Sequence, residues 1–265
     1  MSESKTVNTL LNTELPPSID NAIKNLSDKP TANIGTTVSD IWYIVFGWIS
    51  NVADKKRIQY AHSLEQFRQE LENSVSKIPM EKRIEPSFQA TAQALENAKY
   101  CVEEDELRQM FCTLISNSMN SDYASNVHPS FAEIIKQMSV LDAKIIQLFK
   151  TKKEIIIGLP VCQFRLNFFG PGSYTPIPDH IFLELPDVDF QLCSQSLSSL
   201  SRFGIVSISY EKKLSTPNAY DKFASHPLYQ SMRKYLPTPI DIRIKEGTVE
   251  LTPLGQSFIK VCVPD

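Results

Sequence analysis

The segment from Ile240 to Val263 constrains the fold most, because it predicts two kinds of secondary structure in one short stretch. Isoleucines alternate with polar residues from Ile240 to Ile244, which is the period-two pattern of a strand. We place a tight turn at Glu246–Gly247, a second strand after it, and a helix that begins at Thr252–Pro253. A β-hairpin followed by a capped helix is typical of a winged-helix-like module, which suggests binding more than catalysis.

The N-terminal half instead predicts helices. Apolar residues follow helical spacing over 38–52, and further apolar residues lie elsewhere around the same helix. Such a helix is either buried in the core or lies on a membrane surface. The apolar run is too short to cross a bilayer, which needs about 20 residues. The residues with helical spacing are Val38, Ile41, Trp42, Val45, Ile49 and Val52, and the additional ones are Tyr43, Ile44, Phe46 and Trp48.

Further helices are predicted up to about Lys150. A helix over His62–Ile78 ends at Pro79, and acidic residues Glu103–Glu106 open another one. Ser139 with Asp142 resembles a capping box. The residues expected to face the core are Leu64, Phe67, Leu71, Val75 and Ile78; Ile84, Phe88, Ala92, Leu95 and Val102; Leu107, Met110, Phe111, Leu114, Ile115 and Met119; and Phe131, Ile134, Ile135 and Met138, in a helix that Pro129 begins.

Strands begin after Glu154, where a continuous apolar run passes into alternation of Phe164, Leu166 and Phe168 with polar residues. Phe190–Phe203 predicts a helix, and Gly204 suits its left-handed cap. Another strand follows at 205–211. The polar segment Lys212–Pro239, with a short helix at His226–Leu236, is interpreted as an insertion in the hairpin.

The resulting fold class is α+β and mainly α. We divide the chain into a flexible leader (1–29), a helical domain (30–150) and a winged-helix-like α+β domain with a β-hairpin (151–265), which contains the insertion 212–239. The polar N-terminus lacks the pattern of a signal peptide, so we expect a cytoplasmic protein.

Charge and cysteine content narrow the function classes. The net charge of −3 gives no global attraction to nucleic acid or anionic membranes, although a local basic patch is still compatible with it. The five cysteines are widely spaced, form no CxxC pair and mostly have apolar neighbours. They indicate buried thiols of a reducing compartment.

No catalytic motif is recognised. The sequence contains no P-loop, GxGxxG, GxSxG or HExxH pattern, so we expect no cofactor and no metal, and we lean against an enzyme. The glycine-rich FGPGS at 169–173 is interpreted as a turn, and the carboxylates of 103–106 as a helix N-terminus. Catalytic residues stay unknown. Among His62, His128, His180 and His226, we would test His128 first, because His-Pro at a helix start fixes its position.

A DNA-reading winged helix would use Phe190–Phe203 as its recognition helix. The helix contains one arginine, Arg202, which gives little attraction to phosphates, and Arg243 and Lys245 could add to it. Its polar residues are Gln191, Ser194, Gln195, Ser196, Ser198, Ser199, Ser201 and Arg202.

The order of motifs resembles the bacterial Abi-alpha family of abortive-infection proteins, a domain of unknown function. The resemblance begins near Pro30 with IGTTVSDIWYIVFGWI and HSLEQFRQELENSVSKIP, and ends with LSSLSRFGIV and VELTPLGQSFIKVC. Its most specific part runs from Glu103 to Phe149, with His128-Pro129 and Leu141-Asp142-Ala143. The resemblance implies a role in defence against phage and no known enzymatic activity.

Four functions follow as alternatives. The first is a defence protein that acts through contacts with a host or phage protein. The second is a membrane-acting effector that uses the apolar helix 38–52. The third is a DNA-binding regulator. The fourth, a hydrolase or nuclease, requires His128 or His180 to converge with two carboxylates in a pocket. The sequence does not give the oligomeric state or the trigger.

Overall fold

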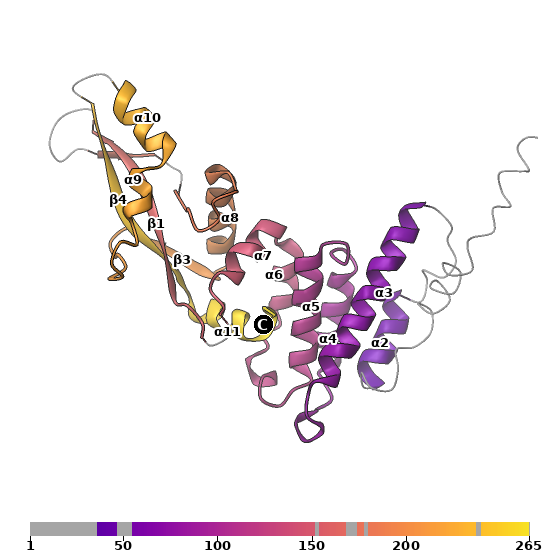
Figure 1. Cartoon of the computed structure of the whole chain (residues 1–265). Coiled ribbons are helices and arrows are strands. Elements are labelled where there is room, and N and C mark those ends of the chain that lie inside the picture. Colours follow the sequence, from indigo (N-terminus) through magenta and orange to yellow (C-terminus); the bar gives the residue numbers. More distant parts are fainter. Residues whose placement is uncertain are drawn as a thin grey trace, which may run out of the picture.

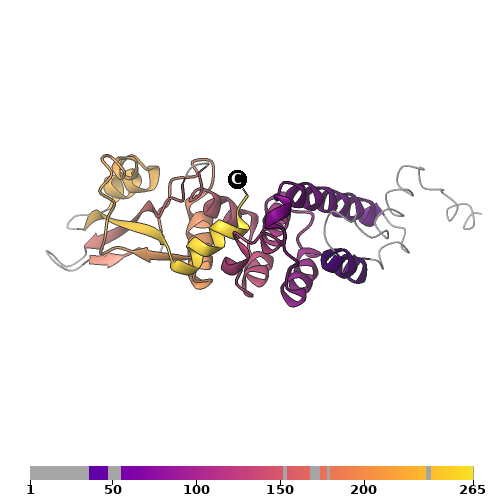
Figure 2. The ribbon, with the colours of Figure 1, turned by 90° about the horizontal axis from the view of Figure 1, so that it is seen from below.

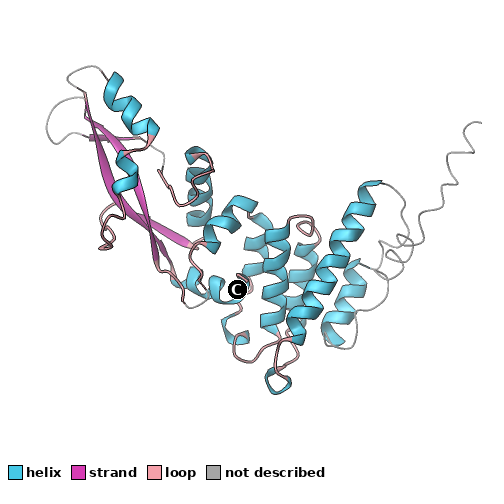
Figure 3. Ribbon diagram, viewed as in Figure 1, coloured by secondary structure: helices cyan, strands magenta, loops and turns pink. Residues whose placement is uncertain are grey.

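The computed structural model describes residues 36–46, 55–151, 154–167, 174–177, 180–236 and 240–264. Helices α2 to α7 gather at one end of this part of the chain, and the strands lie at the other end with α8, α9 and α10 beside them (Figure 1, Figure 2 and Figure 3). It is a mixed and mainly helical structure, which confirms the α+β class. The elements are, in order, α2 (Thr36–Phe46), α3 (Lys55–Ser76), η3 (Met80–Lys82), α4 (Phe88–Ala98), α5 (Asp105–Ser118), η4 (Ala124–Asn126), α6 (Phe131–Gln137), α7 (Val140–Gln147), β1 (Gly158–Asn167), β2 (Tyr174–Pro176), α8 (Phe190–Arg202), β3 (Val206–Ser209), α9 (Asp221–Ala224), α10 (Pro227–Tyr235), β4 (Asp241–Leu251) and α11 (Pro253–Cys262).

Helix α2 is buried along one face. Trp42 is fully buried, with its ring 4.6 Å from that of Phe46 and 5.3 Å from that of Phe67 on α3. On the other face, the exposed fractions of Tyr43 and Ile44 are 52% and 71%. The prediction that this helix is buried in the core is therefore confirmed for the apolar stripe up to Val45. The helix is amphipathic, because its other face is exposed to solvent. Trp48, Ile49 and Val52 lie outside the described residues.

The predicted stripes of α3, α5 and α6 all lie in the core, but the stripe of α4 is partly wrong. The exposed fractions of Ile84 and Phe88 are 40% and 62%, although both were expected to face inward. The helix begins only at Phe88. Leu95 is buried as predicted, but its buried neighbours in the helix are Ala94 and Ala98. Helical spacing counted back from Leu95 therefore does not predict burial for Ile84, which precedes the helix, or for Phe88, at which it begins.

Two predicted caps are confirmed. In α7, the Ser139 hydroxyl oxygen accepts from the Asp142 backbone N–H at 3.1 Å, and the Ser139 N–H donates to Asp142 Oδ2 at 2.8 Å. After α8, Gly204 adopts φ of +72°, the left-handed conformation expected of its cap. Pro129 does not begin a helix, because α6 starts at Phe131 with Ser130 as its N-cap.

The sheet has four strands in the order β2-β1-β4-β3, and all neighbours are antiparallel. Strand β4 runs without interruption from Asp241 to Leu251, so the turn predicted at Glu246–Gly247 is wrong. Gly247 instead lies opposite Val161 in the ladder, where a Cβ atom would come within 2.5 Å of the Tyr210 ring. The glycine marks a close approach within a strand. The antiparallel pair β3–β4 encloses the segment predicted as an insertion, with α10 inside it.

The face of the long β1–β4 ladder that is buried in a core changes along its length. Near the helices, Leu159, Val161 and Val249 lie on one face and join the main core. Further out, Phe164 and Ile242 lie on the opposite face and form a second core with Phe223 of α9. Figure 2 shows α10 on this side of the sheet. In the far half of the ladder (163–167 and 241–245), the face that continues from Leu159 and Val161 consequently points away from α9 and α10.

Helix α11 connects the sheet to the helices. The Thr252 hydroxyl accepts from the Gly255 N–H at 2.9 Å and caps the helix as predicted. At the other end, the Asn117 side-chain amide of α5 donates to the Val261 carbonyl at 3.1 Å. Because Phe258, Ile259 and Cys262 are fully buried between these contacts, α11 belongs to the main core.

Candidate functional site

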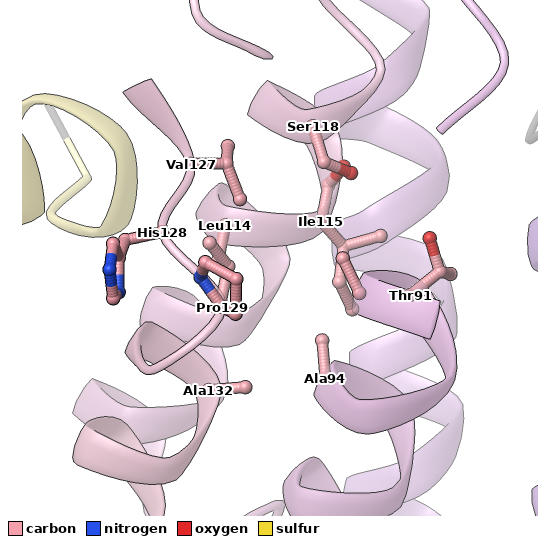
Figure 4. A pocket seen from close by; sticks show the side chains of 10 residues that line it. Thr91, Ala94, Leu114, Ile115, Ser118, Val127, His128, Pro129 and Ala132 are labelled. Atoms are coloured by element: carbon pink, nitrogen blue, oxygen red, sulfur yellow. The ribbon is translucent and has the colours of Figure 1, made fainter. Parts of the chain in front are cut away.

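A groove lies between α4, α5 and the segment that leads into α6. Its inner end is a cavity of about 10 Å³, and its outer part holds about 260 Å³. Ala90, Ser118, Val127 and Pro129 line both parts, so they form one continuous feature. We call it the α4–α6 groove. The inner cavity is also lined by Thr91, Ala94, Leu114, Ile115, His128 and Ala132 (Figure 4). The outer part is also lined by Ile84, Glu85, Pro86, Ser87 and Ala124.

Large apolar side chains lie exposed where α4 begins. Ile84 lines the outer part of the groove, and Phe88 lies in the chain between the lining residues Ser87 and Ala90. Backbone bonds fix this segment to the end of α5, because the Ile84 N–H donates to the Met119 carbonyl at 2.9 Å. The exposed side chains therefore stand on a rigid frame beside the groove.

Thr91 gives the inner cavity a polar group. The residue is 1% exposed, and its hydroxyl oxygen has no hydrogen-bond partner among the described residues. A buried polar group without a partner costs about 1–3 kcal/mol. The cavity has the size that one water molecule occupies, so a bound water could satisfy this hydroxyl.

His128 lies at the edge of the groove and is engaged by its own turn. Its Nδ1 lies 2.7 Å from the Ser130 hydroxyl oxygen and accepts from the Ser130 backbone N–H at 3.2 Å. Figure 4 shows the ring on the opposite side of Pro129 from Ile115 and Thr91. These contacts hold the turn before α6. They do not provide the carboxylate that would orient a general base.

The other histidines occupy separate elements. His180 Nδ1 lies 2.7 Å from the Tyr210 hydroxyl oxygen, and His226 Nδ1 accepts from the Leu228 N–H at 3.3 Å as the N-cap of α10. Burial lowers the pKa of His226. His62 is exposed on α3. The structure thus does not bring these residues together, and the convergence required for a hydrolase is not seen in the described residues.

The acidic run 103–106 forms ion pairs at the start of α5. Asp105 Oδ1 lies 2.8 Å from Arg108 Nη1, and Glu106 Oε1 lies 3.4 Å from Lys144 Nζ. The Arg108 guanidinium is buried and also donates to Glu70 of α3 at 3.1 Å. Throughout the described ranges, no three metal-ligating side chains gather in one place.

The polar residues of α8 divide between packing and solvent. Ser194 and Ser196 are buried, so they cannot contact base edges as a recognition helix requires. The Ser194 hydroxyl oxygen accepts from the His180 backbone N–H at 2.9 Å. Gln195 and Ser199 line a shallow pocket against Asp142 of α7. Gln191, Ser198, Ser201 and Arg202 are at the surface.

All five cysteines are buried free thiols, as the sequence predicts. Burial raises the pKa of Cys101 to about 11 and raises the pKa values of Cys112 and Cys262 well above their ordinary value. These thiols are therefore protonated and unreactive at neutral pH.

Within the described ranges, every helix is too short or too polar to cross a membrane. This finding does not favour the membrane-acting alternative for helix 38–52, whose tryptophan at 42 is turned into the core.

Comparison with known proteins gives one family. The model described as Abortive infection alpha matches residues 59–262, which includes α4, the α4–α6 groove and the whole sheet. No match is found among curated proteins or among solved structures. Since the match covers most of the sequence from α3 to the end of α11, the chain belongs to the Abortive infection alpha family.

Proposed function

We propose that this protein acts in abortive infection by binding a partner protein in the α4–α6 groove. The family relationship indicates the abortive-infection role. The observation that supports the binding mode is the pair of exposed side chains, Ile84 and Phe88, on the rigid frame beside the groove. The five buried thiols support a cytoplasmic location as part of this proposal.

The energetics favour a protein as the occupant of the groove. Burial of one large apolar side chain contributes about 1.5–3 kcal/mol, and aromatic residues are enriched at the centres of protein interfaces. The groove offers apolar walls at Ala90, Val127 and Pro129, with the Thr91 hydroxyl at its inner end. An apolar side chain of the partner would fill the outer part, while Phe88 would pack against the partner's surface.

The C-terminal half enters this proposal as a winged-helix-like module. Helix α8 is followed by β3 and β4, which pair antiparallel and would form the wing, and α11 closes the module. In this arrangement the module acts as a frame that fixes α11 against α5, the helix that lines the groove.

The test compares captured partners and phage plating. Tagged protein is recovered from phage-infected cells as the native chain, as Ile84→Asp with Phe88→Asp, and as the control Ile157→Asp. Ile157 is 51% exposed and lies outside the groove, so its substitution replaces one exposed isoleucine by aspartate, as at Ile84, without altering the site. We expect the double variant to lose both the partner and the reduction in plating, and the control to keep both.

Thermal unfolding of each variant accompanies these measurements, because an unfolded variant would lose activity for another reason. A folded double variant that still captures the native partner and still lowers phage plating would refute the groove as the binding site. Loss of both properties in the Ile157→Asp control would refute it equally.

A further inference from the structure

The far half of the β1–β4 ladder presents basic side chains on the face opposite α9 and α10. Arg165 lies directly opposite Arg243, and Gln163 lies opposite Lys245. Side chains of directly paired residues point to the same face of a sheet, and residues two apart along a strand share that face as well. Arg165, Arg243 and Lys245 therefore form one basic stripe.

The like charges of this stripe are only partly compensated. Directly opposite like charges destabilise a strand pair. Arg165 Nε donates to the neutral Gln163 side chain at 3.2 Å, and Arg243 Nε donates to Asp241 at 3.3 Å. Asp241 is the carboxylate of the far half that shares this face, so three cations stand against one anion. The sequence segments next to the ends of these strands, 168–173 and 237–239, contain no charged residue.

An aromatic ring accompanies the cations. Tyr174 of β2 lies opposite Asn167 in the ladder, and its ring centroid is 5.0 Å from the Arg243 guanidinium carbon. This is a cation–π contact, and it places the guanidinium over the face of the ring. Planar guanidinium groups bind phosphate through two parallel N–H donors, which lysine cannot reproduce.

We propose that the basic stripe, formed by Arg165, Arg243 and Lys245, binds the phosphate backbone of duplex DNA. A protein partner would be expected to engage large apolar residues. In the described parts of β1, β2 and β4, however, no large apolar side chain is exposed. Duplex DNA presents closely spaced negative charges, and they complement a row of cations on a rigid sheet.

The site differs from the α4–α6 groove and does not depend on the function proposed for that groove. The chain as a whole carries −3, so attraction to DNA comes from the local stripe and must be sensitive to salt. Three phosphate contacts predict a slope of log K against log salt of about −2.7, at about −0.9 per contact. With this slope, an increase in salt from about 50 to about 200 mM weakens binding about 40-fold.

The experiment uses the full chain and a labelled duplex DNA of random sequence, with binding measured by fluorescence anisotropy over a salt series. The test variant is Arg165→Gln with Arg243→Gln. The matched control is Lys212→Gln with Lys213→Gln, which removes the same charge from the opposite face, where these lysines pair with Glu250 and Glu246. Single-stranded DNA of the same length and poly-L-glutamate are measured in parallel.

We expect the control to keep the native slope, and the test variant to retain a slope of about −0.9 and a salt effect of about 3.5-fold. Duplex DNA should bind more tightly than the other two polymers. The proposal is overturned if the native chain does not bind the duplex at low salt, or if both double variants lose the same affinity. Equal or tighter binding of poly-L-glutamate or of single-stranded DNA overturns it as well. Circular dichroism confirms that each variant is folded.

Discussion

Replacement of Gly255 by alanine tests how α11 meets the sheet. Gly255 lies in the first turn of α11, and a Cβ atom at this position would lie 2.0 Å from the Ile205 carbonyl oxygen and 3.0 Å from its carbonyl carbon. Ordinary contact begins near 3.4 Å, so the helix and the start of β3 would have to separate by about 1.4 Å. Both groups are backbone, and no side-chain rotation can relieve the clash.

The magnitude follows from two opposing effects. Glycine in a helix is less favourable than alanine by about 1 kcal/mol, so Gly255→Ala would stabilise an isolated α11. Overpacking costs about 1–3 kcal/mol, and the upper end applies because Thr252 ties the helix to the Gly204 and Ile205 carbonyls. We expect a net loss of about 2 kcal/mol, or a fall in Tm of about 4–8 °C for a chain of this size.

The assay is urea and thermal unfolding followed by circular dichroism, with Gly158→Ala as the matched control. A Cβ atom at Gly158 in β1 would meet its nearest neighbours at 3.5 Å, which is ordinary contact. The control should therefore be neutral or slightly stabilising. If Gly255→Ala instead equals or exceeds the native stability, α11 does not approach Ile205 as the structure has it, and the account of how the sheet is attached is wrong.

Two further predictions concern single side chains. Trp42→Ala should lower the free energy of unfolding by about 3–5 kcal/mol in urea titration, because the ring is fully buried against Phe67. Ile44→Ala, on the exposed face, should change it by less than about 0.5 kcal/mol. Equal effects of the two substitutions would contradict the amphipathic placement of α2. Burial lowers the pKa of His226 in the folded state, so the unfolded chain binds more protons and stability should fall as the pH drops through about 6.5. His226→Asn keeps an N-cap acceptor and should show a smaller loss of Tm between pH of about 7.5 and 5.5; an unchanged loss would show that His226 does not contribute.

Much of the helical part could be predicted because its signals are local. Five residues of α5 and its C-cap Met119 are predicted in the core from their helical spacing, and all six are buried. The capping box at Ser139 and the left-handed Gly204 also depend on residues that are close in sequence. The residues that predict these caps are therefore the residues that form them.

The parts that could not be predicted depend on distant residues. A glycine after Glu246 predicts a turn, yet Gly247 is required because Tyr210 packs against the strand. The exposure of Phe88 follows from where α4 begins, which its apolar spacing does not define. Arg243 was singled out from the sequence, but its partner Arg165 was not, because only the register of β1 against β4 places them opposite each other.

The two proposed surfaces are connected through the core, which determines how their variants should be interpreted. Leu114 and Ile115 of α5 line the α4–α6 groove, while Asn117 on the same helix holds α11 through the Val261 carbonyl. Thr252 then attaches α11 to the start of β3, and β3 pairs with β4, which carries Arg243. A core change such as Gly255→Ala should weaken both binding activities in proportion to the unfolded fraction. A change on either surface should weaken or remove the activity of that surface and leave Tm and the other activity unchanged. Loss of DNA binding in a folded Phe88→Asp variant would show that the two surfaces are not independent.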